Sequence, residues 1–579
     1  MRKRLEYDKY LNLRNLYQEK VSKIASFRMI LFLVMIISFI LKYYYYPVFF
    51  GIVFGVSLFG FVVLVFVHDK YYKIYDYYIK YVEVMDTYLA RECDEWKKFS
   101  DKGEDFLDDR KPFLQDLDVL GDCSLYQYLS ICKTLGGRER LVWKLSNLEM
   151  EEADLREEQE AIAELTQKIS FDIEFQIAMQ YYNQKKVHLT NDMAYLDKGI
   201  GSRKRDFIIA VVASFSCLLL LGLACLHILS FSYFYGMFIF NFLLSFLYSY
   251  IFHEEYVCLE RTVQSYSKLS GVMDVILKNK FQSSKMKKII KVMQKGKVDI
   301  VRLEKLDSMN SLKNNLLANF LFNGLCCFNL ILLYCFSNFL NKNLDDFKES
   351  VALIEELEAM ISLTSLGIVK KNKCMPVIEK QVGLQFLEIQ HPLLGENVCV
   401  GNDFEGKAGV HIITGSNMGG KTSFLRTIGI NLILMNAGSY VCAKNFQASY
   451  FKLFTSMRVV DDIEKGISTF YGELLRIEEM VKYVDCGNML VLIDEIFKGT
   501  NYQDRIYGAR EVIHKLSTKK TMVFITTHDF ELCEEKGVTN YYVKEEYKGD
   551  KIIFDYKIRK GKCSSTNARY LMKKLGIID

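Results

Sequence analysis

A glycine-rich stretch that follows an apolar segment has the residue types and spacing of a phosphate-binding loop. The segment "GVHIIT" (409–414) predicts a buried strand, and the next residues fit the pattern G-x-x-x-x-G-K-[ST] before a helical run. Glycines let successive backbone N–H groups face a phosphate, and the helix N-terminus adds a partial positive charge. We expect nucleotide phosphates to be bound by Gly415, Ser416, Asn417, Met418, Gly419, Gly420, Lys421, Thr422 and Ser423.

Metal and water chemistry are predicted where this loop meets a second strand. Lys421 is expected to reach the β- and γ-phosphates of ATP, and the Thr422 hydroxyl to ligate Mg²⁺. The buried-strand pattern "MLVLID" ends in Asp494 and is followed by Glu495. Asp494 suits Mg²⁺, usually through water, and Glu495 suits the orientation of an attacking water. A solvated strand end is the alternative interpretation of this pair.

A third apolar segment, "TMVFITTH" (521–528), ends in His528, which would sense the γ-phosphate. The carboxyl ends of parallel strands lie at one edge of a sheet, where ligands bind in doubly wound α/β folds. These patterns therefore predict an α/β P-loop ATPase domain with Glu495 and His528 as its catalytic residues.

The composition bounds the remainder of the chain. Its 579 residues require more than one core, and only 4 prolines favour long helices. The net charge of +5 arises from 75 basic and 70 acidic residues, which is too balanced to indicate nucleic acid by itself. The 15 cysteines lack metal-ligand spacing, so we interpret them as reduced thiols.

Two stretches predict membrane hairpins. Residues 207–252 contain no Asp, Glu, Lys or Arg, which fits two spans and a short turn better than a buried soluble hairpin. A weaker pair covers 29–46 and 48–67, where Lys42 is the one charged residue and the tyrosines of "YYYYP" (43–47) suit an interfacial turn.

Positive charge indicates the orientation of these spans. Residues 1–28 carry eight basic and three acidic side chains, and the basic "GSRKRD" (201–206) adjoins the third span. The positive-inside rule places three parts of the chain on the cytoplasmic side of a bacterial-type cell membrane: the N-terminus, residues 69–206 and everything after 253. The basic leader is not expected to be a cleaved signal peptide.

The apolar stretch 316–340 is long enough to span a membrane. Asn319, Asn323 and Asn329 interrupt it, and a fifth span would place the phosphate loop outside the cell. We therefore expect a buried helix of the cytosolic part, with a fifth span as the alternative.

Apolar residues at helical spacing in 69–206 and 253–376 predict a helical core or lever. The basic run 278–297 could face anionic lipid or a phosphate backbone, although a solvated helix face is the commoner explanation.

Four motifs, in this order and spacing, resemble the ATPase domain of the MutS family, which belongs to the ABC-type ATPases. They are "TGSNMGGKT", "DDIEKGISTFYGEL" (461–474), "LIDEIFKGT" and "TTHDFEL" (526–532). The resemblance covers residues 385–579, with a weaker similarity at 125–165 to the family's helical core.

The resemblance implies a homodimer with two ATP–Mg²⁺ sites formed between subunits. By it, Ser468 and Thr469 would contact the partner's γ-phosphate, Asn417 would help to hold the phosphates and water, and Asp504 would lie near the subunit junction. Hydrolysis would open and close the dimer and move the levers, which in this chain lead to membrane helices.

Departures from the family are equally informative. The mismatch-reading wedge of the repair members is missing, and residues 207–252 stand about where those members insert a DNA clamp. Cys399 occupies the position expected for an adenine-stacking aromatic residue, and Phe497-Lys498 replaces Gly-Arg after the acidic pair. Base specificity and turnover rate are thus less predictable than phosphate binding.

The predicted organisation is an ABC-type P-loop ATPase domain C-terminal to an all-α lever interrupted by transmembrane hairpins. Its parts are a leader (1–28), a hairpin (29–68), a lever (69–206), a second hairpin (207–252), the second part of the lever (253–376) and the ATPase domain (377–579).

The leading functional prediction is a membrane-anchored dimeric ATPase that couples ATP hydrolysis to lever motion. The alternative is a membrane-tethered protein of the repair or recombination type that holds duplex or branched DNA. An ABC exporter is disfavoured because the chain has four expected spans and "GISTF" in place of an LSGGQ-type motif.

Overall fold

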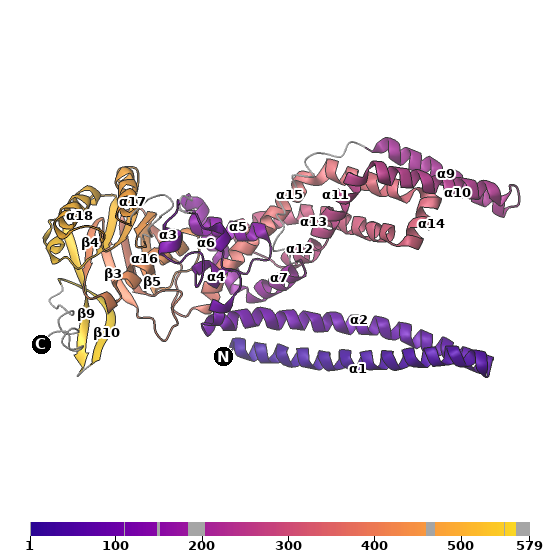
Figure 1. Ribbon diagram of the computed structural model, residues 1–579, viewed down its shortest axis with the longest axis horizontal. Coiled ribbons are helices and arrows are strands. Elements are labelled where there is room, and N and C mark those ends of the chain that lie inside the picture. The colour runs from indigo at the N-terminus through magenta and orange to yellow at the C-terminus, as the bar shows by residue number, and fades with distance from the viewer. Residues whose placement is uncertain are drawn as a thin grey trace. The chain divides into compact units, whose positions relative to one another are not determined.

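The fold is a mostly helical region followed by mixed α/β sheets, as the sequence predicts at this coarse level (Figure 1). The computed structural model describes residues 2–108, 110–147, 151–182, 203–458, 469–548 and 551–562. The chain divides into two compact units, one containing residues up to 91 with 170–181, and the other containing 92–169 with 182 onward.

The first unit is built on two long helices, α1 (Arg2–Tyr44) and α2 (Pro47–Glu92). They are joined at 45–46, where Pro47 opens α2 with a preset backbone angle. Tyrosine contacts hold the pair together, with the rings of Tyr10 and Tyr81 stacked at 3.7 Å. Helix α7 (Ile169–Tyr182) packs on α2 through Asp172, whose carboxylate accepts a 2.7 Å hydrogen bond from the Tyr88 hydroxyl.

The second unit begins with helices of very different lengths. They are η1 (Glu95–Lys98), η2 (Glu104–Phe106), α3 (Phe113–Asp116), α4 (Leu125–Leu129), α5 (Leu135–Ser146), α6 (Glu152–Gln167), α9 (Lys204–Cys225), α10 (Phe231–Ile251), α11 (His253–Tyr266), α12 (Leu269–Lys278), α13 (Ser284–Asn314), α14 (Leu316–Cys326) and α15 (Phe328–Val369).

Helix α15, with 42 residues, connects the apolar hairpin α9–α10 to the sheets. Near its start, Tyr334 stacks on Phe207 of α9 with ring centroids 4.2 Å apart. Near its end, the buried Glu358 carboxylate caps the start of α5 by accepting a 2.7 Å hydrogen bond from the Lys133 backbone N–H. The Leu363 carbonyl accepts a 3.0 Å bond from the hydroxyl of Ser439, which follows helix α16 (Lys421–Asn436) of the sheet domain.

A second buried carboxylate on α15 makes the stability of this region pH-dependent. Glu355 is 2% exposed and its Oε1 atom has no hydrogen-bond partner in the described part of the chain. Burial, reinforced by the nearby Glu358 carboxylate, raises the pKa of Glu355 from 4.5 to about 8. The folded protein therefore holds a proton that the unfolded chain releases, so this group lowers stability progressively as the pH rises from 4.5 to about 8.

A Glu355→Gln variant is expected to unfold at a higher temperature than the wild type at pH 8, and at the same temperature at pH 4.5. Glutamine cannot ionise, so the loss of stability across that window disappears. Thermal melts between pH 4.5 and 8.5 test this, with Glu349→Gln at an exposed position of the same helix as the control. If the melting temperatures of Glu355→Gln and the wild type change with pH in parallel, the raised pKa of Glu355 is contradicted.

Four helices in the described part of the chain are long and apolar enough to cross a membrane: α1, α2, α9 and α10. They coincide with the two hairpins expected from the sequence. A further candidate exists only if α14 and the start of α15, which are bent by 87° at their junction, count as one span.

The expected single buried helix over 316–340 is wrong. The chain breaks at Cys327, whose φ of 46° lies in the left-handed region, and two helices result. Residues 328–340 of α15 are largely buried, but α14 exposes several apolar side chains, including Leu316 at 87% and Leu317 at 77%. Apolar composition alone could not distinguish the exposed helix α14 from the buried start of α15.

The C-terminal part contains two sheets. The smaller has the order β1-β5-β2-β3 and the larger the order β10-β9-β4-β8-β7-β6. The strands are β1 (Val377–Glu379), β2 (Gly383–Ile389), β3 (Asn402–Lys407), β4 (Gly409–Thr414), β5 (Asn445–Ser449), β6 (Lys452–Ser456), β7 (Met489–Asp494), β8 (Thr521–Thr526), β9 (Val538–Lys548) and β10 (Lys551–Lys560).

Helices cover both faces of the larger sheet. Strands β6, β7, β8, β4 and β9 are parallel, and β10 pairs antiparallel with β9. Helix α16 (Lys421–Asn436) packs in the apolar core on one face, while α17 (Thr469–Tyr483) and α18 (Tyr502–Leu516) pack in the core on the other. This layering brings the carboxyl ends of β4, β7 and β8 to one edge.

Candidate nucleotide site

The glycine-rich loop lies between β4 and α16 and includes a 3₁₀ turn, η3 (Asn417–Gly419). Two of its glycines have positive φ, +133° at Gly415 and +89° at Gly420. A Cβ atom at Gly415 would lie 2.3 Å from Val543 Cγ2 and one at Gly419 would lie 2.5 Å from the same atom. Both the backbone conformation and the close approach of β9 therefore require glycine.

Gly415→Ala is expected to abolish nucleotide binding, because the loop must move to clear Val543 and relieve its backbone strain. Gly409→Ala is a matched control at the start of β4, the strand that precedes the loop. Gly409 has a φ of +139°, but no atom lies within 4 Å of the added Cβ. Titration with a fluorescent ATP analogue distinguishes the two. Equal effects of both substitutions would mean that the close approach of Val543 is unimportant.

Lys421 is buried with its ammonium group inside the loop. Its Nζ donates to the carbonyls of Gly415 at 2.6 Å and Ser416 at 2.9 Å, and lies 3.3 Å from His528 Nε2. The lysine ammonium group therefore lies against the loop backbone and beside His528, as expected of the lysine of a phosphate-binding loop.

Oxygen ligands suited to a magnesium ion come together from three elements. The Thr422 hydroxyl lies 2.9 Å from both carboxylate oxygens of Asp494, and the Thr526 hydroxyl donates to Asp494 Oδ1 at 2.6 Å. The parallel register that pairs Asp494 with Thr526 produces this proximity. Mg²⁺ binds through one or two such side chains with water and phosphate oxygens completing its shell, so the donor set of Thr422 and Asp494 fits it.

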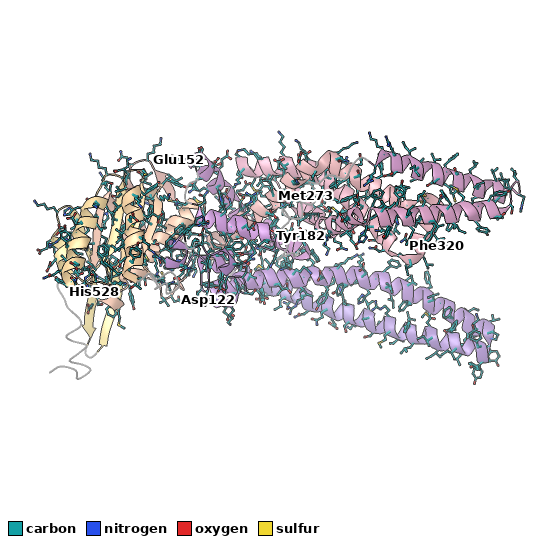
Figure 2. The ribbon with its side chains drawn as sticks, turned by 45° about the horizontal axis from the view of Figure 1, so that its top comes forward. Asp122, Glu152, Tyr182, Met273, Phe320 and His528 are labelled. Atoms are coloured by element: carbon teal, nitrogen blue, oxygen red, sulfur yellow. The ribbon has the colours of Figure 1, made fainter. Side chains whose placement is uncertain are left out.

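Glu495 and His528 form the other half of the site. His528 Nε2, at the position labelled in Figure 2, lies 3.1 Å from Glu495 Oε1, and Lys498 Nζ lies 3.6 Å from Glu495 Oε2. The hydrogen bond with His528, assisted by the charge of Lys498, outweighs burial and lowers the pKa of Glu495 to about 2. The carboxylate is therefore ionised at neutral pH and can accept a hydrogen bond from water.

The backbone after β7 is strained around this carboxylate. Glu495 has φ +58° and Phe497 has φ +60°, values that are uncommon for residues other than glycine. The Glu495 N–H donates to the Thr526 carbonyl and hydroxyl, both at 3.1 Å, and the Phe497 N–H donates to the buried Glu473 carboxylate at 2.5 Å. These bonds hold the strained turn and thereby direct Glu495 toward His528.

The other predicted site residues are less informative in this structure. Met418 is 71% exposed and Ser423 is exposed, while Thr469 is the first residue of α17. Ser468 and the side chain of Asn417 lie outside the described residues. Asp504 lies in the first turn of α18 and bonds Asn501, the residue that caps the helix.

At two positions where the sequence departs from the family, Cys399 and Lys498, the structure shows which neighbours the side chain contacts. Cys399 Sγ accepts a 3.3 Å hydrogen bond from the His391 N–H, so it packs against its own entry segment. Lys498 lies within 4 Å of both Asp494 and Glu495, so a cation follows the acidic pair despite the loss of the Gly-Arg sequence.

Contacts from the helical region to the elements around the candidate site were not predicted from sequence. Asp118 bonds Arg426 of α16 at 3.0 Å and Arg458, which follows β6, at 2.6 Å. Asp116 accepts from the backbone N–H of Arg458 at 3.1 Å and from Arg476 of α17 at 2.9 Å. The segment "LQDLDVL" contains no known motif, so only the fold reveals that it joins elements around the site.

Fold and site together define a mixed α/β domain with a glycine-rich loop and strand-end carboxylates at one edge of a parallel sheet. Residues 411–574 match the sequence model of MutS domain V. The match is thus to this domain of the MutS family, over less than half of the chain.

Similar proteins agree with this assignment. The chain is 28% identical over 246 residues to the DNA mismatch repair protein MutS of Carboxydothermus hydrogenoformans, and 30% identical over 246 residues to the Endonuclease MutS2 of that organism. It is 33% identical over 242 residues to the DNA mismatch repair protein MutS of Finegoldia magna. These matches cover 40%, 41% and 40% of this chain but only 29%, 31% and 28% of the relatives, in the same order.

Proposed function

We propose that this protein is a membrane-anchored, MutS-like dimeric ATPase. ATP and Mg²⁺ bind at the candidate nucleotide site, and hydrolysis drives motion of the helical region and of the membrane helices attached to it. The ATPase domain lies on the cytoplasmic side of a bacterial-type cell membrane. Its partners are a second copy of the chain and the lipid bilayer.

The observation that carries the ATPase proposal is the convergence of five side chains from three strand ends. Lys421 and Thr422 come after β4, Asp494 and Glu495 lie at the end of β7, and His528 comes after β8. Lys421 lies 3.3 Å from His528, Thr422 lies 2.9 Å from Asp494, and His528 lies 3.1 Å from Glu495. A buried cation, an oxygen pair for Mg²⁺ and an ionised carboxylate are the parts that phosphoryl transfer to water needs.

Lys421→Ala is expected to weaken ATP binding about tenfold or more, because a buried charge-assisted contact to phosphate contributes roughly 1.5–3 kcal/mol. The measurement is isothermal titration of the detergent-solubilised full chain with ATP and Mg²⁺. Lys444→Ala is the control, since that lysine is 57% exposed and pairs with Glu388 on the surface. Unchanged binding by Lys421→Ala would overturn the proposed site.

Support for membrane anchorage comes from the apolar helices. In the described chain, α9 and α10 carry no charged side chain between Phe207 and Ile251, and most of their large apolar residues are exposed. Water would disfavour so much exposed apolar surface, whereas lipid would cover it. The same reasoning applies to the apolar halves of α1 and α2.

Support for a dimer comes from the family resemblance of the segment that leads into α17. Ser468 and Thr469 would complete the partner's site, so hydrolysis would require two chains. Whether dimerisation needs ATP is tested by sizing the solubilised protein with and without nucleotide.

A second candidate is DNA binding, favoured by a stripe of lysines on α13. Lys287, Lys291 and Lys295 are exposed, recur every four residues, and have no acidic partner within 4 Å in the described chain. By contrast, Lys285 and Lys288 of the same helix pair with Glu158 and Glu157.

The test is the salt dependence of binding to duplex and four-way-junction DNA. If the stripe contacts phosphates, replacing the three lysines with glutamate should reduce the slope of log affinity against log salt by roughly 3. No binding to either DNA at low salt would exclude this second candidate and leave the membrane ATPase proposal intact.

A further inference from the structure

Helix α14 has an apolar face that the described chain covers only at Phe320, whose ring contacts Phe238 and Phe242 of α10. Leu316, Leu317, Phe320 and Leu321 are between 48% and 87% exposed, and Phe320 is labelled in Figure 2. Asn319 and Asn323, whose side chains bond each other, lie along the edge of this face, and Asn323 is buried. The apolar side of the helix therefore faces outward, the reverse of a helix at a water-exposed surface.

Neighbouring side chains supply hydrogen bonds to the backbone at the break between α14 and α15. The Gly324 carbonyl accepts from Asn241 Nδ2 at 3.1 Å and from the Cys217 thiol at 3.6 Å. The Asn329 N–H at the start of α15 donates to Asn323 Oδ1 at 2.9 Å. Irregular backbone is tolerated at membrane depth only where protein satisfies it in this way.

Apart from Lys313, the charged residues of α9, α13 and α15 are well separated from this break along the chain. At 1.5 Å per residue, Cys217 lies about 16 Å from Asp206 along α9, and Cys327 lies about 22 Å from Lys342 along α15. On α13, Asp307 lies about 14 Å before the start of α14. The hydrocarbon core of a bilayer is about 30 Å thick, so these distances reach toward its centre.

Lys313, the exception to this pattern, turns back toward the charged side. Its Nζ lies 4.1 Å from the ring centroid of Tyr256, which is in the first turn of α11 beside Glu254 and Glu255. Long basic side chains commonly extend in this way from apolar surroundings to a polar boundary.

Helices α13 and α15 run in opposite directions against each other. Lys285 of α13 pairs with Glu356 of α15 at 2.9 Å, and further along α13 Gly296 packs on Ser350, which comes earlier on α15. The chain therefore approaches α14 and leaves it on the same side.

We propose that α13, α14 and α15 form a re-entrant segment: α14 lies in the plane of the bilayer, within its hydrocarbon layer, and its apolar face contacts lipid acyl chains. The chain enters and leaves on the cytoplasmic side, so no fifth span exists and the ATPase domain stays in the cytoplasm. This inference rests on the proposed membrane anchorage. It gives the helical region, through α13 and α15, a direct contact with the lipid interior.

The test is a tryptophan introduced by Leu317→Trp into the full chain, reconstituted in phosphatidylcholine vesicles with brominated acyl chains. Leu219→Trp on α9, 51% exposed, is the lipid control, and Val377→Trp on β1, 48% exposed, is the aqueous control. The signal of the two native tryptophans, Trp96 and Trp143, is subtracted with the parent protein.

Loss of fluorescence at Leu317→Trp to the extent seen at Leu219→Trp, with none at Val377→Trp, is the expected result. Quenching at Leu219→Trp alone would overturn the re-entrant helix but leave the anchorage in place. Quenching at neither position would overturn the anchorage itself.

Sidedness is checked with Ser308→Cys and Lys342→Cys in sealed vesicles of defined orientation, using a membrane-impermeant maleimide and mass spectrometry of the labelled peptides. Both cysteines should react from the cytoplasmic side. Labelling from opposite sides would mean that the segment crosses the membrane, which would overturn re-entry.

Discussion

Glu495→Gln is expected to slow ATP hydrolysis about 100-fold or more while leaving ATP binding nearly unchanged, which is the effect of removing a group that acts on the attacking water. Glutamine keeps the size of the side chain but has no negative charge. The ionised Glu495 carboxylate is held by His528 at 3.1 Å, whereas Lys421 and Thr422 are the residues expected to bind the phosphates and Mg²⁺. Binding and hydrolysis should therefore separate in this variant.

Steady-state phosphate release and ATP titration measure the two quantities on the same preparation. Glu534→Gln is the matched control, because its side chain is 77% exposed and its nearest cation, Lys562, lies 3.6 Å away. If hydrolysis separates the subunits, Glu495→Gln should also accumulate as an ATP-bound dimer on sizing. A chiefly monomeric variant with wild-type turnover would contradict both the role of Glu495 and the proposed switch.

The candidate site was predictable because its information is local. The glycine spacing before Lys421 prescribes a loop conformation whatever surrounds it, and Asp494 ends a run of buried apolar residues. Parallel pairing then brings strand ends together, so Thr422, Asp494 and His528 could be expected near one another before any coordinates. The layered α/β fold follows from the same alternation of strands and helices.

Contacts between distant segments were not predictable. Thr526 and Glu473 hold the turn after β7 through bonds that depend on sheet register and on the docking of α17. Nothing in the local sequence indicates that Phe497 adopts a positive φ. The break at Cys327 also depends on partners such as Asn241, 86 residues earlier, so composition suggested one helix where there are two.

Asp116 is the clearest of these distant contacts, and its removal should strongly destabilise the ATPase domain. The carboxylate is 0% exposed and accepts four hydrogen bonds: 2.7 Å from the Thr455 hydroxyl, 3.2 Å and 3.1 Å from the backbone N–H groups of Met457 and Arg458, and 2.9 Å from Arg476. Asp116→Ala leaves these donors buried without their acceptor. Breaking a buried ion pair of this kind costs about 3–5 kcal/mol.

A thermal melt of the solubilised chain should accordingly show a much lower transition for Asp116→Ala than for Asp122→Ala. Asp122, at the position labelled in Figure 2, has a 64% exposed side chain that pairs with Lys102 at 3.0 Å, and such surface pairs contribute about 0.2–1 kcal/mol. Because Asp116 belongs to the helical region and its four donors to the sheet domain, a destabilised transition would mean that the helical region holds the end of β6 and α17 in place. Equal melting of the two variants would mean that this joint does not secure the domain, and that helical motion must reach the site by another contact.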